Sequence, residues 1–259
     1  MVLGRRALIQ RALICYTTVA RTSEVPQIAL PPLRDDYRRL YLVRHGETDW
    51  NLDGRMQGRT DNALNSNGER QASLLRDYLR AEPIELITSS NLQRAATTAA
   101  SVACAHPNAK QSPAMPAFAE MCFGELEGKR LIDRKAEYDS YISSWRAGDN
   151  GRRWPGTGGE SPEDVASRGL AGLCELGLLP AIAGTAVVQP RPSERRILVA
   201  AHGRFNKILI AALQGDLRAA SDVKQGNTAI NVLDFSPEGK VELVRVDERG
   251  HLVGERVLA

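Results

Sequence analysis

The chain has 259 residues and a mass of 28.3 kDa, which is long enough for one large domain with its own hydrophobic core. Hydrophobic residues make up 42% of the chain and charged residues 25%. These ordinary globular values exclude wholesale disorder. No apolar run approaches the roughly 20 residues that a membrane-spanning helix needs, so we expect no membrane partner.

The four cysteines are widely spaced, and no two of them form a CxxC pair. This spacing excludes a disulfide scaffold and a cysteine zinc site. We therefore expect them to be small buried apolar side chains in a reducing compartment. They are Cys15, Cys104, Cys122 and Cys174.

The net charge of +3 is unevenly distributed. Residues 1–23 contain four arginines and no acidic residue, whereas the rest of the chain has 30 basic and 31 acidic residues. Because nucleic-acid-binding domains are strongly basic, the body of the chain is predicted to bind no nucleic acid.

The N-terminal stretch resembles an organelle transit peptide. Around Arg5, Arg6 and Arg11 the apolar residues recur at helical spacing, and acidic residues are absent. A secretory signal is disfavoured because Gln10-Arg11 interrupts the apolar run, whereas a disordered tail stays an alternative. We expect residues 1–36 to be a transit peptide or disordered leader with a proline-punctuated linker. A transit peptide would direct the protein to the mitochondrion or plastid, and the alternative location is the cytoplasm. The folded domain would span residues 37–259.

Beyond the leader, short apolar runs alternate with stretches of helical periodicity. This alternation predicts an α/β fold, a three-layer α/β/α sandwich with a mostly parallel central sheet. In chain order we expect strand 39–43, a helix capped by Ser66 with Glu69 and stopped by Pro83, strand 85–88, a helix through 95–102, a helix opened by Ser161, strand 196–201, helix 205–213, and strands 227–235 and 241–246 as a hairpin. Residues 180–196 are predicted to form a surface loop.

Two histidines share one local context. His45 and His202 each follow an apolar strand and precede a glycine. Ligands of open α/β sheets gather beyond the carboxyl ends of the strands, so both rings are expected to face one crevice. Arg44 and Arg94 lie at comparable strand ends, and a guanidinium suits phosphate oxygens. Amides at the helix start after Gly203 would add donors, so the set predicts a pocket for a phosphate dianion.

These residues belong to a longer ordered series of short blocks. The series comprises Leu42–Asn51, Gly54–Gly58 with Asp61, Ser89–Ala95, Glu120 with Phe123-Gly124 and Glu127-Gly128, Gly159–Ser161 and Ala201–Gly203. It resembles the signature of the histidine phosphatase superfamily, also called phosphoglycerate mutase-like, from about residue 39 to 235.

The resemblance implies a role for each matching residue. His45 would be the nucleophile that becomes phosphohistidine, and Glu120 the general acid and then the base that activates water. Arg44, Arg94 and His202 would clamp the phosphoryl oxygens, in keeping with catalysis by positioning and electrostatics. Substrate-binding roles are further implied for Asn51, Gln57, Gly58 and Gly203. The resemblance implies no metal and no other cofactor.

The resemblance covers both phosphatases and phosphoglycerate mutases. Gln57 before Gly58, the block around Glu160 and the short segment between Glu120 and His202 favour the phosphatase branch. We expect a metal-independent hydrolase that acts on a small phosphorylated metabolite, either as a monomer or as a homodimer. A cofactor-dependent mutase and a catalytically inactive phospho-ligand binder are the alternatives. All the catalytic positions are filled, which disfavours the inactive binder.

The remaining candidates have ordinary interpretations. His106 and His251 are expected to be solvated, and Lys129 with Arg130 could steer an anionic substrate. Residues 121–160 are predicted to form a lid that determines specificity. Their tryptophans, Trp145 and Trp154, fit a substrate mouth or lid packing equally well.

Overall fold

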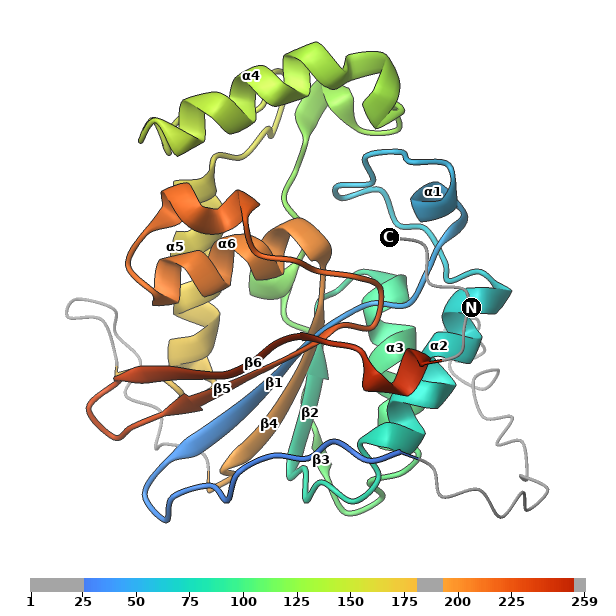
Figure 1. Ribbon diagram of the computed structural model, residues 1–259, viewed down its shortest axis with the longest axis vertical. Helices are drawn as coiled ribbons and strands as arrows, with labels where there is room; N and C mark the ends of the chain where they lie inside the picture. Colours follow the sequence, from blue (N-terminus) through green and yellow to red (C-terminus); the bar gives the residue numbers. More distant parts are fainter. Residues whose placement is uncertain (1–25, 181–192, 254–259) are drawn as a thin grey trace, which may run out of the picture.

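A computed structural model describes residues 26–180 and 193–253 (Figure 1). Residues 1–25 of the predicted leader and most of the predicted surface loop lie outside these residues. Within them, no helix is long and apolar enough to cross a membrane.

The centre of the molecule is a six-stranded sheet with the order β3-β2-β4-β1-β5-β6. Strand β1 pairs with β4 in parallel and β2 pairs in parallel with both β4 and β3, whereas β5 runs antiparallel to β1 and β6. The sheet is therefore mixed, and the predicted hairpin of its last two strands is confirmed. The strands are β1 (Arg38–Arg44), β2 (Leu86–Ser89), β3 (Lys110–Gln111), β4 (Arg196–Ala201), β5 (Ile230–Phe235) and β6 (Val241–Glu248).

Helices cover both faces of the sheet, which confirms the predicted three-layer α/β/α sandwich (Figure 1). The α-helices are α1 (Asp49–Leu52), α2 (Ser66–Tyr78), α3 (Gln93–Ala103), α4 (Lys135–Arg146), α5 (Pro162–Glu175) and α6 (Gly203–Leu213). Short 3₁₀ helices are η1 (Pro116–Phe118), η2 (Gly124–Leu126), η3 (Leu131–Arg134), η4 (Leu217–Ser221) and η5 (Gly250–Leu252).

Alternation along the central strands builds two hydrophobic cores. Leu40 and Leu42 of β1 belong to the core under α5 and α6, whereas Tyr41 and Val43 belong to the core under α2 and α3. Successive side chains of a strand point to opposite faces, so a strand buried on both sides is apolar throughout. This is why the sequence around β1 is a continuous apolar run rather than an alternating one.

Helix α2 is capped differently from the prediction. The N-cap of α2 is Asn65, whose side chain accepts from the Gly68 amide at 2.8 Å, and Ser66 is the first helical residue. Gly68 allows a close approach at this end, because a Cβ there would lie 2.0 Å from the Glu47 carbonyl oxygen. The start of α2 therefore packs directly on the loop that follows β1.

Packed residues precede the domain start expected at Tyr37. Ile28 is buried in the core beside α2, and Arg39 donates to the Pro31 carbonyl at 3.0 Å. Arg39 also forms a two-pronged ion pair with Asp234 of β5, with both contacts at 2.7 Å. This pair joins neighbouring strands and lies almost fully out of solvent.

We predict that Asp234→Ala lowers the free energy of unfolding by about 3–5 kcal/mol, because it leaves the Arg39 guanidinium buried without its counter-charge. Urea unfolding followed by circular dichroism measures the change. The matched control is Glu242→Ala, which breaks the exposed ion pair with Arg34 and should cost a small fraction of that amount. Equal losses of unfolding free energy in the two variants would contradict the prediction that the buried Arg39–Asp234 pair matters more for stability.

Candidate active site

The carboxyl ends of the three parallel strands β1, β2 and β4 lie at one edge of the sheet. Strand β4 lies between β2 and β1, and Ala201 is in register with Arg44. His45 and His202 follow β1 and β4, and their ring centroids lie 5.2 Å apart with a 56° angle between the planes. The prediction that the two rings lie together at this edge of the sheet is confirmed.

The His45 ring is held in one tautomer. Its Nδ1 lies 2.6 Å from the carbonyl oxygen of Gly46, which can only accept, so Nδ1 carries the proton and Nε2 has the free lone pair. Burial, and then the charges of Arg94 and Arg44, lower the pKa of His45 well below 6.5. The ring is therefore neutral at pH 7, as a nucleophile must be.

The backbone of His45 is fixed from the opposite side. Its carbonyl accepts from the Thr228 amide and from the Asn227 side chain, both at 3.2 Å. Thr228 has a φ of +52°, which is a strained region for a β-branched residue and costs on the order of 1–3 kcal/mol. Its hydroxyl lies 2.8 Å from Nε2 of His251, which helps to hold this conformation.

The second ring, His202, contacts a residue that follows β2. Its Nε2 lies 2.6 Å from the Ser90 hydroxyl, which itself accepts from the Leu92 amide at 3.1 Å. When Ser90 donates to Nε2, the proton lies on Nδ1, a buried nitrogen with no partner among the described residues. Burial, followed by the charges of Arg94 and His45, lowers the pKa of His202 well below 6.5.

Two arginines form the cationic part of the site, and of these Arg94 is buried and Arg44 is half-buried. Arg94 is fully buried and donates to the carbonyls of Thr60 at 2.7 Å and Gly58 at 2.8 Å. Arg44 donates to the Gln225 carbonyl at 2.6 Å. The Nε atoms of both arginines are buried and unpartnered within the described ranges. Burial lowers the pKa of Arg94 to about 10, which leaves it cationic at neutral pH.

Glu120 lies at the start of α6. One carboxylate oxygen accepts from the amides of Met121 and Phe205 at 2.8 Å each, and the other accepts from the amide of Arg204 at 3.1 Å. The prediction that the amides after Gly203 bind phosphate is wrong for these two helix residues, because Glu120 occupies them. The first turn of α6, which His202 precedes, instead holds the carboxylate of Glu120.

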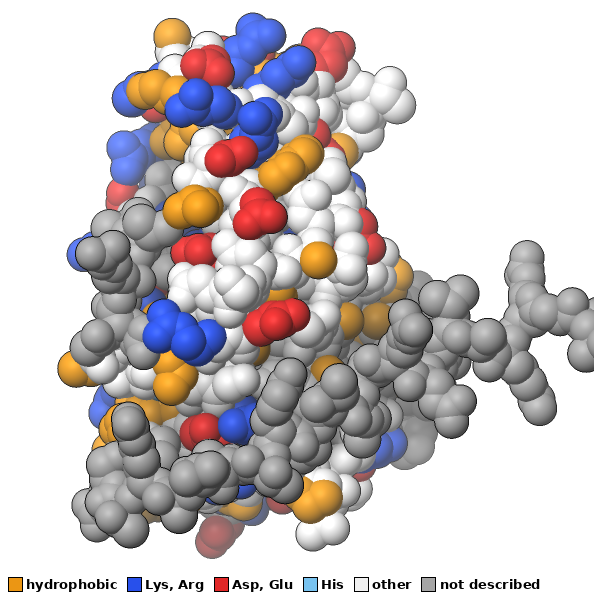
Figure 2. Space-filling view, turned by 90° about the vertical axis from the view of Figure 1, so that its right-hand side faces the viewer, with side chains coloured by type: hydrophobic (Ala, Val, Ile, Leu, Met, Phe, Trp, Pro, Cys, Tyr) orange, Lys and Arg blue, Asp and Glu red, His pale blue; other side chains and the backbone are white. Residues whose placement is uncertain are grey.

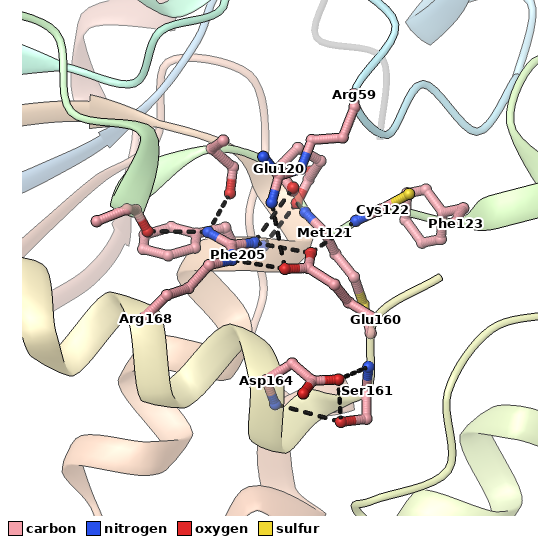
Figure 3. A network of polar contacts seen from close by, with 12 residues as sticks. Arg59, Glu120, Met121, Cys122, Phe123, Glu160, Ser161, Asp164, Arg168 and Phe205 are labelled. Atoms are coloured by element: carbon pink, nitrogen blue, oxygen red, sulfur yellow. Dashed lines mark hydrogen bonds and ion pairs between the residues drawn. The ribbon is translucent and has the colours of Figure 1, made fainter. Parts of the chain in front are cut away.

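A second network fixes the segment that carries Glu120 (Figure 3). Arg168 of α5 donates to the carbonyls of Ala117 and Ala119 at 2.8 and 2.7 Å, and to the carbonyl of Glu120 at 3.2 Å. Its Nε pairs with Glu160 at 2.8 Å, and Glu160 also accepts from Arg59 at 3.2 Å. The block around Glu160 therefore positions the backbone next to Glu120.

The other predicted binding residues surround this centre less directly. Asn51 accepts from Thr48 and from Asn227, so it contacts the group that holds the His45 backbone. Gln57 is buried beside Gly58, whose carbonyl accepts a hydrogen bond from the Arg94 guanidinium. Gly58 has a φ of +52°, and a Cβ there would lie 2.0 Å from the Glu127 carboxylate. A Cβ on Gly203 would lie 3.2 Å from Nε of Arg44, so this glycine leaves room for the guanidinium.

Sequence reasoning assigned no role to several residues that support the site. They are Ser90, Gln225, Asn227 and Thr228. Ser90 could have been found, because it follows a predicted strand that precedes Arg94. The turn of residues 225–228 carries no signal of its own, because it reaches His45 only through the antiparallel pairing of β5 with β1.

Several structural expectations are wrong. His106 and His251 are 8% and 6% exposed and so are buried rather than solvated. Cys104 is exposed and neither Cys122 nor Cys174 is fully buried, so the cysteines of the described residues are not core side chains.

The predicted lid segment has a packed interior. Trp145 and Trp154 are 3% and 2% exposed, and their rings meet edge-on with centroids 5.0 Å apart. Tyr138 and Tyr141 of α4 also contact Trp154. The tryptophans therefore pack inside the segment and do not line a mouth.

Lys129 and Arg130, expected to steer an anionic substrate, are both exposed. They lie just before η3 and α4, at the end of the molecule where Figure 2 shows many Lys and Arg side chains among a few acidic ones. That this end of the molecule attracts an anionic substrate stays a prediction.

Comparison with known proteins identifies the family. The model of the histidine phosphatase superfamily (branch 1) matches residues 40–248. The chain belongs to this superfamily and is an enzyme of the histidine phosphatase type.

Three relatives illustrate the similarity. The uncharacterised phosphatase PhoE of Bacillus subtilis is 29% identical over 214 residues, covering 82% of this chain and 96% of the relative. The probable phosphoglycerate mutase GpmB of Photorhabdus laumondii is 31% identical over 200 residues, covering 76% and 85%. A solved mycobacterial glucosyl-3-phosphoglycerate phosphatase in complex with VO3 has a TM-score of 0.66 and 28% identity, covering 81% of this chain and 99% of its own. Phosphatases and mutases thus both occur among the relatives.

We predict that all four histidines titrate below pH 6.5 in the folded enzyme. Burial lowers the pKa of His45, His106 and His202, and lowers that of His251 to about 4. A lowered pKa means that the unfolded chain binds more protons below pH 6.5, so stability is lost as the pH falls from there. Titration of the ring resonances by NMR measures this, with urea-unfolded protein as the reference. A folded-state midpoint at or above 6.5 for any of the four would contradict the prediction.

Proposed function

We propose that the protein hydrolyses a small phosphomonoester through a phosphohistidine on His45, without a metal ion. The observation that carries the proposal is that three residues interacting with the His45 ring each have a buried nitrogen without a hydrogen-bond partner. Nε of Arg44, Nε of Arg94 and Nδ1 of His202 have no acceptor within the described part of the chain. A buried donor without an acceptor is costly, and the oxygens of a bound phosphoryl group would satisfy all three.

The first half of the reaction forms a bond between phosphorus and Nε2 of His45. The phosphorus–oxygen ester bond breaks, and Glu120 donates a proton to the departing alkoxide. Arg44 and Arg94 stabilise the charge on the equatorial oxygens, which is the main contribution that a protein makes to phosphoryl transfer.

The second half returns the enzyme to its starting state. Glu120, now ionised, removes a proton from a water molecule, and the water oxygen attacks phosphorus. The phosphorus–nitrogen bond breaks, inorganic phosphate leaves, and the electron pair returns to Nε2 of His45. The sum is one ester and one water converted to one alcohol and one phosphate.

Metal independence is supported by the side chains that are present. Across residues 26–180 and 193–253, no three His, Cys, Asp or Glu residues come together as a set that could hold a metal ion. The charge that a metal would supply is provided here by two guanidinium groups.

We predict that His45→Ala lowers kcat for p-nitrophenyl phosphate in EDTA by at least about 1,000-fold, because it removes the nucleophile. Glu120→Gln should lower kcat for an alkyl phosphate by about 100-fold or more, because alkoxide departure needs the proton. The matched control is Glu125→Gln, an exposed carboxylate in η2, which should retain wild-type turnover. Unchanged turnover in His45→Ala would refute the mechanism.

A phosphoglycerate mutase is the second candidate, and the similarity to GpmB supports it. The two functions differ in whether water or a second hydroxyl receives the phosphoryl group. We predict that the enzyme incubated with 3-phosphoglycerate and catalytic 2,3-bisphosphoglycerate releases inorganic phosphate faster than it forms 2-phosphoglycerate. Rapid isomerisation with little phosphate release, followed by ³¹P NMR, would identify a mutase instead.

A further inference from the structure

Helix α6 carries two cations that the phosphoryl pocket does not use. Arg204 and Lys207 are three residues apart and therefore lie on one face of the helix. Both are half-buried. Neither the guanidinium nor the ammonium group has a hydrogen bond or an ion pair with any residue of the described ranges.

Both cations adjoin the leaving-group side of the site. The amide of Arg204 donates to Oε2 of Glu120 at 3.1 Å, so the first turn of α6 touches the proposed general acid. The alcohol oxygen of the substrate must lie beside Glu120 to receive its proton. The rest of the alcohol portion therefore lies near this turn of α6.

Helix α4 contacts the same turn of α6. The Arg204 guanidinium carbon lies 5.5 Å from the ring centroid of Tyr138. This aromatic face holds the guanidinium in place without neutralising it, because a ring quadrupole attracts a cation but carries no net charge.

Arg204 and Lys207 have no carboxylate of the described residues within ion-pair distance. Arg44 and Arg94 match the two negative charges of a phosphoryl dianion. Glu120 attracts both α6 cations and Asp247 attracts Lys207, but neither carboxylate forms an ion pair with them. Burial, and then the neighbouring charges of Arg204 and Arg44, lower the pKa of Lys207 to about 8, as is expected for a cation without a partner.

We propose that Arg204 and Lys207 form a subsite for a second anionic group on the alcohol portion of the substrate. The substrate class is then a phosphomonoester that carries a carboxylate or a further phosphate near the scissile bond. This inference rests on the proposed function, because it uses the position that Glu120 gives the leaving group. Carboxylates and phosphates are both recognised by guanidinium and ammonium donors.

Matched substrate pairs test the subsite in the full-length enzyme. For the carboxylate, 3-phosphoglycerate is compared with glycerol 3-phosphate, and for the phosphate, fructose 1,6-bisphosphate is compared with fructose 6-phosphate. We expect wild-type kcat/KM to favour the doubly anionic member of at least one pair by 10-fold or more. Arg204→Gln and Lys207→Gln should each reduce that ratio by about 10-fold. Arg70→Gln and Lys240→Gln, which change exposed cations elsewhere, should preserve it.

Calorimetry with His45→Ala supplies a readout that needs no turnover and no change in α6. This variant should bind the doubly anionic member of the favoured pair at least 10-fold more tightly than its partner. Hydrolysis of p-nitrophenyl phosphate with ratios near one for both pairs would refute the subsite and leave the hydrolase intact. A high wild-type ratio that survives both α6 substitutions would also refute it. Absence of all hydrolysis together with selective binding would refute the proposed function and support the subsite.

Discussion

The site depends on the burial of two histidines and Arg94, with the half-buried Arg44 beside them, at one edge of the sheet. Removing these groups from water has opposite consequences for the two residue types. The imidazoles lose their charge because their pKa values fall well below 6.5, whereas the guanidinium groups keep theirs. The result is a neutral imidazole beside fixed positive charge, which is the arrangement that the proposed phosphoryl transfer requires.

This arrangement is maintained by the backbone rather than by direct contacts among the catalytic groups. The tautomer of His45 is set by a carbonyl one residue away, and its own carbonyl is held by the turn of residues 225–228. Glu120 is held by amides at the start of α6 and by Arg168 on the carbonyl before it. Such supports restrict movement of the reacting atoms, so little reorganisation is needed during the reaction.

Much of the fold and of the central site follows from the sequence. The apolar runs before His45 and His202 specify buried parallel strands, and parallel strands end at the same edge of a sheet, so convergence of the two rings was predictable. The partners of Glu120 in α6 were not predictable, because their amides lie 84 and 85 positions further along the chain. The burial of His251 was also not predictable, because it depends on a strained turn at Thr228 whose sequence resembles an ordinary polar loop. Packing between short polar segments that are distant in the chain leaves no periodic pattern in the sequence from which it could be predicted.

The leaving-group side of the crevice differs in character from the phosphoryl side. In the proposed arrangement, the phosphoryl side is built from buried donors with fixed geometry, whereas the leaving-group side is formed by the cations of α6 and by aromatic residues of α4. Such an arrangement would let one centre serve different esters through changes in those two helices, and the relatives bear the names of different phosphatases and mutases.

Direct identification of the covalent intermediate tests the account most decisively. Enzyme mixed with a ³²P-labelled phosphomonoester, quenched within milliseconds in alkali and digested, should yield one labelled peptide, with the phosphoryl group on the His45 ring. Label on another residue, or a burst of phosphate with no labelled protein, would contradict it.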